Sequence, residues 1–360
     1  MRIIQLLPTL LPGDAVSNNV LAIADVLTQH GFENDIVTCN DIKRNPQITE
    51  KVQQIMPGEY LRQTDADVFI YHMAIGSELT DFVIDADVKK KIMIYHNITP
   101  AEFYKNLPLL SADCINGRKQ LQKLAEHIDF GIGVSEYNKS ELDALSYKKT
   151  ASIPLIMDLE DYTNTKPSRT VMDKYTDDGF VNILFVGRIA PNKKHEDVIA
   201  SFHVYNRYIN PKSRLFLVGS YNSTENYHYT LKKLVDSNGI KNVIFTGHIP
   251  FNEIIAYYRV SHLFLCESEH EGFCVPLVEA MLFDLPILAY HSTAIPYTLG
   301  NSGIMFTEKN HKLIAELINA VLTNETLKNE IVAGQRRRLE DFSREKIGRQ
   351  FMELFEEIIK

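Results

Sequence analysis

Two glutamates in the C-terminal third of the chain, Glu271 and Glu279, flank a segment that reads as the start of a helix. Between them lie Gly272 and then an apolar run. Such a segment holds one acid in a loop and the other inside the helix, with the backbone N–H groups of the first turn pointing outward. The N–H groups attract phosphate oxygens, and carboxylates accept hydrogen bonds from hydroxyls. The pattern predicts a site for a ligand that carries both groups, and the competing interpretation is one surface acid and one capping acid.

A second group of residues could supply positive charge to the same ligand. Gly187, Arg188 and Lys193 follow a short apolar run, and Gly219 and Gly247 end the next two such runs. A loop at a strand end that bears two cations can bring fixed positive charges onto a diphosphate. Loop arginines and lysines are usually only solvated. Their occurrence beside the glutamate segment favours phosphate binding.

The elements that must position these residues alternate along the whole chain. Short runs rich in Val, Ile and Phe are separated by stretches of helical periodicity, which is typical of βαβ units around a parallel sheet. The expected strands are 2–7, 35–38, 68–72, 92–95 and 130–134 in the first half and 182–186, 214–218, 242–246, 263–266 and 286–289 in the second, with clear helical patterns at 16–29 and 117–127.

This alternation of strand and helix patterns predicts an α/β protein made of two doubly wound, Rossmann-like domains. A length of 360 residues with 45% hydrophobic content suits two cores. We expect domains at 1–165 and 166–342, joined within a polar segment at 158–179 that lacks sustained periodicity. Two such sheets would leave a cleft at the carboxyl ends of their strands, where ligands bind.

The last segment, 343–360, has the pattern of an amphipathic helix in need of a surface. Ile347, Phe351, Leu354 and Ile358 recur at helical spacing, with charged residues on the other face.

Composition excludes several functional classes. A formal net charge of −8 argues against a dedicated nucleic-acid binder. The four cysteines have neither zinc-finger nor disulfide-framework spacing, which fits a reducing cytoplasm and predicts no metal site. The apolar start ends at Pro12-Gly13 without a signal-peptide pattern, and no run reaches the roughly 20 apolar residues of a membrane span. Any membrane contact would be peripheral.

The combination of Gly187-Arg188, Lys193 and the two glutamates resembles the donor-binding half of retaining glycosyltransferases with the GT-B fold. The resemblance is to the large bacterial family that includes mannosyl-, glucosyl- and rhamnosyltransferases, and it extends over nearly the whole chain. Gly13-Asp14 and the runs 95–100 and 133–137 also stand where that family has matching segments. The run 95–100 is similar to members that build bacterial surface polysaccharides.

The resemblance implies transfer of a sugar from a nucleoside-diphosphate sugar to a hydroxyl of a glycan or lipid-linked acceptor, with retention at the anomeric carbon. It implies an N-terminal acceptor domain, a C-terminal donor domain, and a final helix, 343–360, that returns to the N-terminal domain. No cofactor and no metal are implied. The expected location is the cytoplasm, including the inner face of the membrane.

The same resemblance implies roles for single residues. Arg188 and Lys193 would neutralise the departing diphosphate, Glu271 would contact the donor sugar, and Glu279 would hold the ribose. His96 would face the transferred sugar, and the Gly13-Asp14 turn would close over the phosphates or the acceptor. The remaining implied contacts with the donor are Gly187 and the backbone of Phe273, Cys274 and Val275 at the phosphates, and Gly247, His248 and Ile249 along the nucleobase.

Several alternatives stay open. Cys274 stands where the family usually has Gly, and Tyr297 where it often has Glu. His72 is a rival to His96. The segments 65–67 and 85–87 have the Asp-Ala-Asp pattern of a metal site found in another glycosyltransferase fold, but ordinary turn acids explain both. Other functions are a non-catalytic sugar-nucleotide binding protein and a GT-B epimerase or phosphorylase. An oxidoreductase lacks its Gly-x-Gly-x-x-Gly turn.

Overall fold

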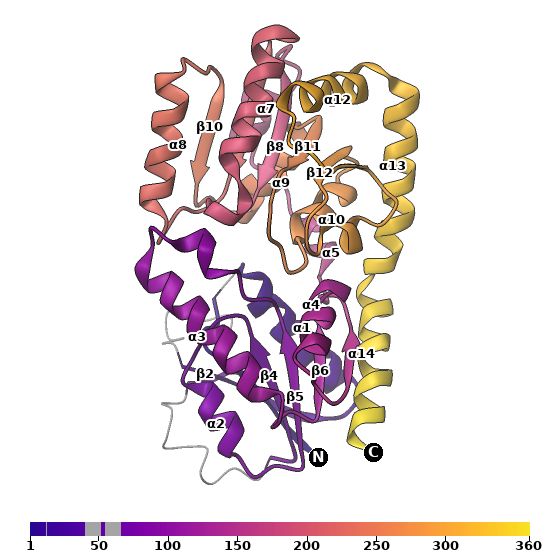
Figure 1. The fold of residues 1–360 in the computed structure, drawn as a ribbon. Helices are drawn as coiled ribbons and strands as arrows, with labels where there is room; N and C mark the ends of the chain where they lie inside the picture. Colours follow the sequence, from indigo (N-terminus) through magenta and orange to yellow (C-terminus); the bar gives the residue numbers. More distant parts are fainter. Residues whose placement is uncertain (12, 40–51, 55–65) are drawn as a thin grey trace. The chain divides into compact units, whose positions relative to one another are not determined.

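The computed structural model describes residues 1–11, 13–39, 52–54 and 66–360, and the chain divides into two compact units (Figure 1). Unit 1 contains Met1–Asp158 together with Phe342–Lys360, and unit 2 contains Leu159–Asp341. Each unit is a parallel sheet covered by helices. No helix among the described residues is both long enough and apolar enough to cross a bilayer.

In its described residues, unit 1 has a seven-stranded parallel sheet of order β3-β2-β1-β4-β5-β6-β7. Strands that are buried on both faces read as continuous apolar runs, which is why they stand out in the sequence. The strands are β1 Arg2–Leu7, β2 Glu33–Thr38, β3 Val52–Gln54, β4 Val68–Met73, β5 Lys90–Tyr95, β6 Phe130–Gly133 and β7 Thr150–Ser152.

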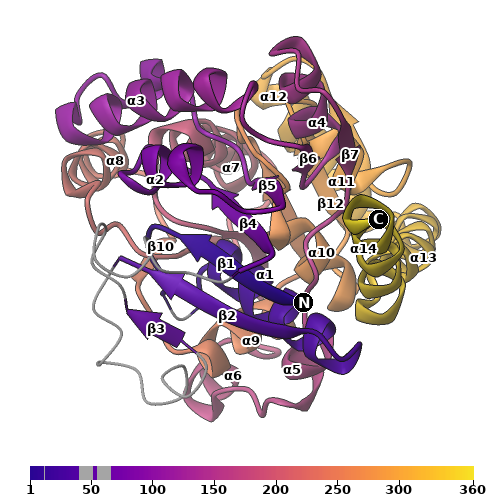
Figure 2. The same cartoon turned by 90° about the horizontal axis from the view of Figure 1, so that it is seen from below.

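Helices cover both faces of this sheet (Figure 2). Alternate residues of each strand point to opposite faces, so Ile4 and Leu6 pack under α2, α3 and α4, whereas Leu7 packs with α1 on the other face. The helices are α1 Ala15–Gln29, α2 Leu79–Asp85, α3 Pro108–Leu124 and α4 Glu136–Ala144, with a 3₁₀ turn η2 at Ala101–Tyr104.

Unit 2 repeats this arrangement with a six-stranded parallel sheet of order β10-β9-β8-β11-β12-β13. Its strands are β8 Val181–Val186, β9 Ser213–Val218, β10 Val243–Gly247, β11 Leu263–Cys266, β12 Ile287–Tyr290 and β13 Ile304–Phe306. Its helices are α5 Leu159–Asn164, α6 Arg169–Tyr175, α7 His195–Tyr208, α8 Glu225–Ser237, α9 Phe251–Val260, α10 Val275–Leu282, α11 Ile295–Leu299, α12 His311–Thr323 and α13 Glu325–Leu339, with 3₁₀ turns η3 Pro191–Lys193 and η4 Glu340–Phe342, the last crossing into unit 1.

In each sheet the strand order reverses at one point, between β1 and β4 in unit 1 and between β8 and β11 in unit 2. The loops that leave the two strands at such a point diverge to opposite faces, which opens a crevice at the carboxyl edge where ligands bind in doubly wound folds. The Gly187-Arg188 loop leaves β8, and the Glu271 loop leaves β11. The topology therefore brings the two candidate segments to the reversal point of unit 2.

The predicted fold class is confirmed, and all ten expected strands are present with ends shifted by at most two residues. Short edge strands such as β3, β7 and β13 were not predicted. They contain only three residues each, too few for a periodic pattern.

The chain passes from unit 1 to unit 2 between Asp158 and Leu159, inside the segment 158–179 where the linker was expected, but most of that segment is not a linker. This segment contains α5 and α6 and belongs to unit 2, so the boundary lies at Asp158 rather than at 165. Val171 and Tyr175 are buried, and the Tyr175 ring stacks edge-on against Phe216 with ring centroids 4.9 Å apart. These helices are too short to show periodicity, and tertiary packing holds them.

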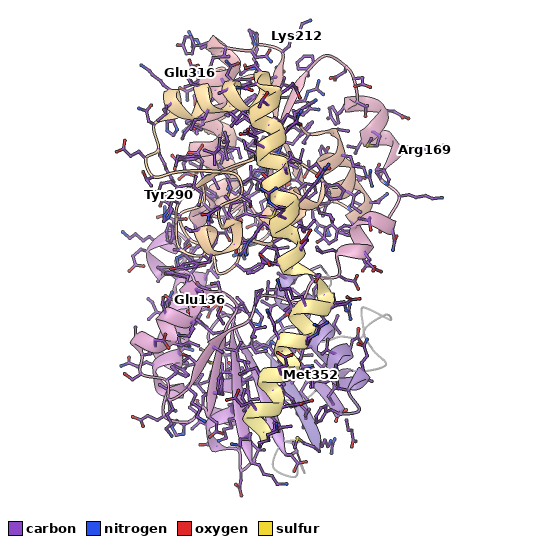
Figure 3. All side chains as sticks on the ribbon, turned by 90° about the vertical axis from the view of Figure 1, so that its right-hand side faces the viewer. Glu136, Arg169, Lys212, Tyr290, Glu316 and Met352 are labelled. Carbon is purple, nitrogen blue, oxygen red and sulfur yellow. The ribbon has the colours of Figure 1, made fainter. Side chains whose placement is uncertain are left out.

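Helix α14, Arg344–Ile359, packs on unit 1; its Met352 is labelled in Figure 3. Ser343 caps its N-terminus, and Phe355 meets Phe32 edge-on with ring centroids 5.4 Å apart. The predicted apolar face is correct at three of its four positions, but Leu354 is only half-buried and the neighbouring Phe355 is buried instead. Helical spacing alone did not predict which of these two adjacent residues is buried.

We expect Phe355→Ala to destabilise unit 1 by about 3–5 kcal/mol, because it removes a buried ring and leaves a cavity beside Phe32. Chemical unfolding followed by tyrosine fluorescence would measure the loss. Glu356→Ala, on the exposed face of the same helix, is the matched control and should change the free energy of unfolding by less than about 0.5 kcal/mol. Equal effects of the two changes would contradict the packing of α14.

Candidate active site

The loop after β8 is held tightly against the end of β9. A Cβ atom on Gly219 would lie 2.0 Å from the carbonyl oxygen of Gly187, and Gly219 has a φ of +153°. Only glycine fits there, since backbone rather than a flexible side chain blocks the space. This contact fixes the start of the loop that carries Arg188 and Lys193. The Arg188 side chain is exposed, and Lys193 ends the 3₁₀ turn that follows.

Lys193, whose side chain is 20% exposed, forms a largely buried ion pair with Glu271. The Lys193 Nζ lies 2.6 Å from one carboxylate oxygen of Glu271 and 2.5 Å from the other, and the Glu271 side chain is 6% exposed. Burial lowers the pKa of Lys193, but attraction to Glu271 outweighs it and leaves that pKa raised. The Glu271 backbone N–H also donates to Thr293 Oγ1 at 2.9 Å. Two residues 78 positions apart thus form one charged centre.

Helix α10 begins beside this pair, and its N-terminus has no side-chain cap. Cys274 occupies the N-cap position in the left-handed region, with a φ of +71°, and the proline near the helix start has no N–H to be satisfied. The preceding Phe273 is buried, and its carbonyl accepts a hydrogen bond from Thr298 Oγ1. The hydrogen bond from Thr298 therefore fixes the turn from Phe273 to Val275. The backbone N–H groups at the uncapped start of α10 favour binding of an anion.

Glu279 lies inside α10 with both carboxylate oxygens engaged. Tyr162 of α5 and Tyr258 of α9 each donate a hydrogen bond to it, both at 2.5 Å. Burial raises the pKa of Glu279, and the two tyrosine hydroxyls oppose that rise. Each carboxylate oxygen keeps a second lone pair for a further donor.

The residues expected along a nucleobase lie at the end of β10. Gly247 is buried and in the left-handed region, and a Cβ atom added to it would lie 3.3 Å from a ring carbon of Tyr221. His248 is exposed and Ile249 is half-buried. Gly247 also forms an isolated bridge with Gly219, which places this turn beside the loop after β8.

In unit 1, Gly13 precedes α1 in the left-handed region, with a φ of +75°. Asp14 is the N-cap of α1, and its carboxylate accepts hydrogen bonds from the backbone N–H and the hydroxyl of Ser17. The turn after β1 is therefore built as a helix cap, which leaves its backbone at the carboxyl edge of the sheet.

His96 and His72 are hydrogen-bonded to each other. From the sequence, they were alternatives for the contact with the transferred sugar. His96 Nε2 lies 3.0 Å from His72 Nδ1, and His72 Nε2 lies 3.0 Å from Gln5 Oε1. The amide group of Gln5 also donates from Nε2 to the carbonyl of Val20 at 3.2 Å. Burial lowers the pKa of both imidazoles, that of His96 to about 3. Both rings are neutral at physiological pH.

This chain of hydrogen bonds fixes the tautomer of His96. The Val20 carbonyl only accepts, so the nitrogen of Gln5 must face it and the amide oxygen must face His72. His72 therefore carries its proton on Nε2 and accepts at Nδ1 from the Nε2 proton of His96. The remaining ring nitrogen of His96, Nδ1, has no described protein partner and bears a lone pair, which suits a hydroxyl donor.

Sequence reasoning missed Gln5, Tyr162, Tyr258 and Glu267. The first three act through partners that lie far away in the chain, and no local motif marks such contacts. Glu267 gives a weak signal, since it is an acid directly after a buried apolar strand.

Glu267 is fully buried next to the site, directly after β11. Neither carboxylate oxygen has a described partner within hydrogen-bond geometry. The nearby Ser201 hydroxyl, 2.9 Å from His311 Nδ1, offsets part of the effect of burial on this acid. Burial raises the pKa of Glu267 to about 7.

Among the described residues, the group of side chains that could hold a metal ion includes none of the aspartates of the Asp-Ala-Asp segments. Asp65 lies outside the described residues, and Asp67 is paired with Lys89 at 2.5 Å. Asp85 ends α2.

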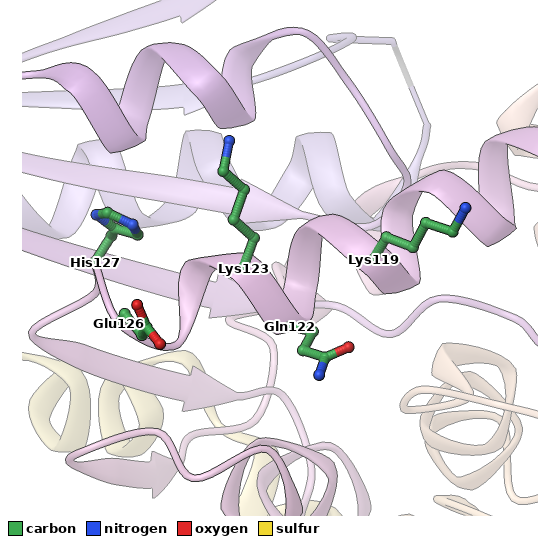
Figure 4. Close-up of a pocket in the computed structure, with 5 residues that line it drawn as sticks. All are labelled: Lys119, Gln122, Lys123, Glu126 and His127. Carbon is green, nitrogen blue, oxygen red and sulfur yellow. The ribbon is translucent and has the colours of Figure 1, made fainter.

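A hollow of about 450 Å³ lies at the end of α3 in unit 1 (Figure 4). All five lining side chains are exposed, and α3 leads into the amino end of β6, at the edge opposite the strand ends that bind ligands. It is therefore a surface concavity and not the site. Its lining residues are Lys119, Gln122, Lys123, Glu126 and His127.

We expect Glu267 to make stability fall as pH rises. Below pH 4.5 the carboxyl is protonated in both states, and between 4.5 and about 7 only the unfolded chain releases the proton. The free energy of unfolding should fall over this range by up to about 3 kcal/mol. Glu267→Gln should remove the fall, as measured by unfolding midpoints between these pH values.

Glu269→Gln is the control of opposite sign. Glu269 is paired with Lys309 and Lys194, which together outweigh its partial burial and lower its pKa, so this substitution should reduce stability at neutral pH. Parallel pH profiles for Glu267→Gln and the parent would contradict the assignment.

Comparison with known proteins bears on the family and the fold. Residues 172–338 match the sequence profile of the family described as glycosyl transferases group 1. The serotype-specific mannosyltransferase WbdA of Escherichia coli is 29% identical over 168 residues, which are 46% of this chain and 20% of that protein. The capsular polysaccharide biosynthesis glycosyltransferase CapM of Staphylococcus aureus is 26% identical over 191 residues, which are 52% of this chain and 48% of that protein.

Two solved structures match nearly end to end. Sucrose-phosphate synthase from Thermosynechococcus elongatus has a TM-score of 0.78 at 16% identity, covering 99% of this chain and 98% of its own. Anabaena HepE, solved with UDP-glucose, has a TM-score of 0.77 at 16% identity, covering 99% and 100%. Likeness at this identity shows the fold alone. The chain spans only a fifth of WbdA and about half of CapM. The chain therefore carries a glycosyl transferases group 1 domain at residues 172–338 and has the GT-B fold.

Proposed function

We propose that this protein is a retaining, metal-independent glycosyltransferase that moves a sugar from a nucleoside-diphosphate sugar to a hydroxyl of a glycan or lipid-linked acceptor. The observation that carries the proposal is the Lys193–Glu271 pair beside the uncapped start of α10, at the strand-order reversal of unit 2. The names of the relatives, which concern mannosyltransfer and capsular polysaccharide synthesis, support surface polysaccharide or glycolipid assembly.

In this proposal, unit 2 binds the donor and unit 1 the acceptor. The diphosphate lies at the start of α10, against the backbone of Phe273 to Val275 and the loop of Gly187. Lys193 has three N–H donors and uses two on Glu271, so one remains for a phosphate oxygen. Arg188, exposed on the same loop, adds a second charge.

Glu271 accepts hydrogen bonds from hydroxyls of the donor sugar, and Glu279 accepts them from the ribose hydroxyls. Both carboxylates use lone pairs that Lys193 and the two tyrosines leave unused. The turn at Gly247, His248 and Ile249 supports the nucleobase. The bare Nδ1 of His96 accepts from a hydroxyl of the transferred sugar, and the turn at Gly13 serves the phosphates or the acceptor.

In the reaction, the bond between the anomeric carbon and the phosphate oxygen breaks, and the acceptor oxygen bonds to the same face of the sugar. The acceptor proton passes to the departing phosphate oxygen. Negative charge grows on the diphosphate as the bond breaks, so Lys193, Arg188 and the helix dipole stabilise the transition state more than the ground state. This chemistry requires no metal and little base.

The reducing cytoplasm is the proposed location, since all four cysteines are free thiols and nucleotide sugars would be the donors. Contact with the inner membrane surface would be peripheral.

The test is turnover with a panel of UDP-, GDP-, ADP- and TDP-sugars, with the anomeric configuration of the product read by NMR. Lys193→Met should lower kcat by about 100- to 1,000-fold, because one preorganised charge at a developing anion is lost. Lys232→Met, an exposed lysine on α8, is the matched control. Activity should persist in excess EDTA. Full activity of Lys193→Met, or an inverted product, would refute the mechanism.

A second experiment tests the hydrogen bonds behind His96. In the parent, ¹⁵N NMR of the histidine rings should show a proton on His96 Nε2 and a bare Nδ1. Gln5→Leu removes the acceptor for His72, so both tautomers of His96 should then be populated and kcat should fall several-fold, with little change in nucleotide affinity. Protonation of His96 Nδ1 in the parent would rule out this arrangement.

A further inference from the structure

Two thiols and a carboxylate converge at the start of α10. The Sγ atoms of Cys266 and Cys274 and a carboxylate oxygen of Glu271 all lie within 4.8 Å of one another, and all three residues are buried. Cys266 ends β11, and Cys274 begins α10. Neither thiol has a part in the sugar transfer proposed above.

The separation of these atoms suits a thiophilic divalent cation. Zn²⁺ binds sulfur at about 2.3 Å and carboxylate oxygen at about 2.0–2.2 Å, so tetrahedral ligands lie about 3.5–3.8 Å apart. Ligand atoms within 4.8 Å reach this spacing through small rotations of the side chains. Two sulfurs favour Zn²⁺ or Cd²⁺ over hard cations such as Mg²⁺ and Ca²⁺.

The surroundings support these ligands. The Cys266 thiol donates to Ser268 Oγ at 3.5 Å. Once the thiol proton is lost, the Ser268 hydroxyl can turn and donate to the thiolate, and such outer contacts orient metal ligands. Ser268 itself is fully buried.

Binding of a divalent cation also leaves the net charge of the buried site unchanged. Without a metal, two neutral thiols, the Glu271 carboxylate and the Lys193 ammonium sum to zero. A divalent cation that displaces both thiol protons adds two positive charges and two thiolates, so the buried sum stays zero and two protons leave to solvent. The fourth position of a tetrahedral cation is left for water.

We propose that Cys266, Glu271 and Cys274 form a binding site for Zn²⁺-type cations, and that occupancy excludes the nucleotide sugar. A bound cation takes Glu271 from the sugar, fixes the Cys274 turn and repels Lys193, which must give up one contact with Glu271. The cation is an inhibitor at this site and not a cofactor. The inhibitory half of this inference rests on the proposed function, whereas the binding half does not.

The binding test uses Cd²⁺ with the reduced full-length protein and needs no substrate. Titration should produce the ultraviolet charge-transfer absorption of Cd²⁺–thiolate bonds, saturating at one equivalent. Cys266→Ser and Cys274→Gly should each abolish it, and Cys39→Ser with Cys114→Ser should retain it. Cys274→Gly suits the left-handed N-cap position, so its fold should persist, and circular dichroism verifies this. Absorption that is absent in the parent, or that persists in Cys274→Gly, overturns the site.

The inhibition test uses Zn²⁺ in the turnover assay. At a Zn²⁺ concentration about ten times the Kd, kcat/KM for the donor should fall about tenfold, with recovery on adding a chelator. Cys274→Gly should lose this sensitivity. Unchanged kcat/KM with the site filled would overturn the exclusion of donor. A failure of the proposed function would appear differently, as Cd²⁺ binding in a protein that turns over no nucleotide sugar.

Discussion

The ion pair between Lys193 and Glu271 is the interaction on which the site of unit 2 depends. It joins the loop after β8 to the loop after β11 across the reversal of strand order, and both charges are largely shielded from water. Removing one partner of such a pair leaves the other charge buried alone, which typically costs about 3–5 kcal/mol. The pair thus fixes two charged groups relative to each other before a ligand arrives.

The neighbouring carboxylates show how environment divides roles among acids of one type. Glu271 is matched by an ammonium, Glu279 by two tyrosine hydroxyls, and Glu267 by no described donor of good geometry. Burial raises the pKa of Glu279 and that of Glu267, which reaches about 7. Buried acids with raised pKa values occur more often at functional sites than elsewhere, so Glu279 and Glu267 point to the same region of unit 2 as the sequence motifs do.

In unit 1, the corresponding reversal point is built from neutral groups. The path from the Val20 carbonyl through Gln5 and His72 to His96 contains no ion, and it controls which nitrogen of His96 can accept. The low pKa of both imidazoles keeps the arrangement intact across physiological pH. Unit 2 thus holds the charges of Lys193 and Glu271 in fixed positions, and unit 1 holds the lone pair of His96 Nδ1 in a fixed position.

The sequence by itself determined the fold class and the ten longer strands, because buried parallel strands read as apolar runs. It also located the segments proposed to carry the site, because loops at the carboxyl ends of such strands carry the polar groups. It did not determine the short helices α5 and α6 or the choice between Leu354 and Phe355, because packing decides these rather than local pattern. Only the tertiary structure joined Lys193 to Glu271, Glu279 to Tyr162 and Tyr258, and His96 to Gln5. These partners lie far apart in the chain, and a hydrogen bond between distant residues leaves no trace in local spacing.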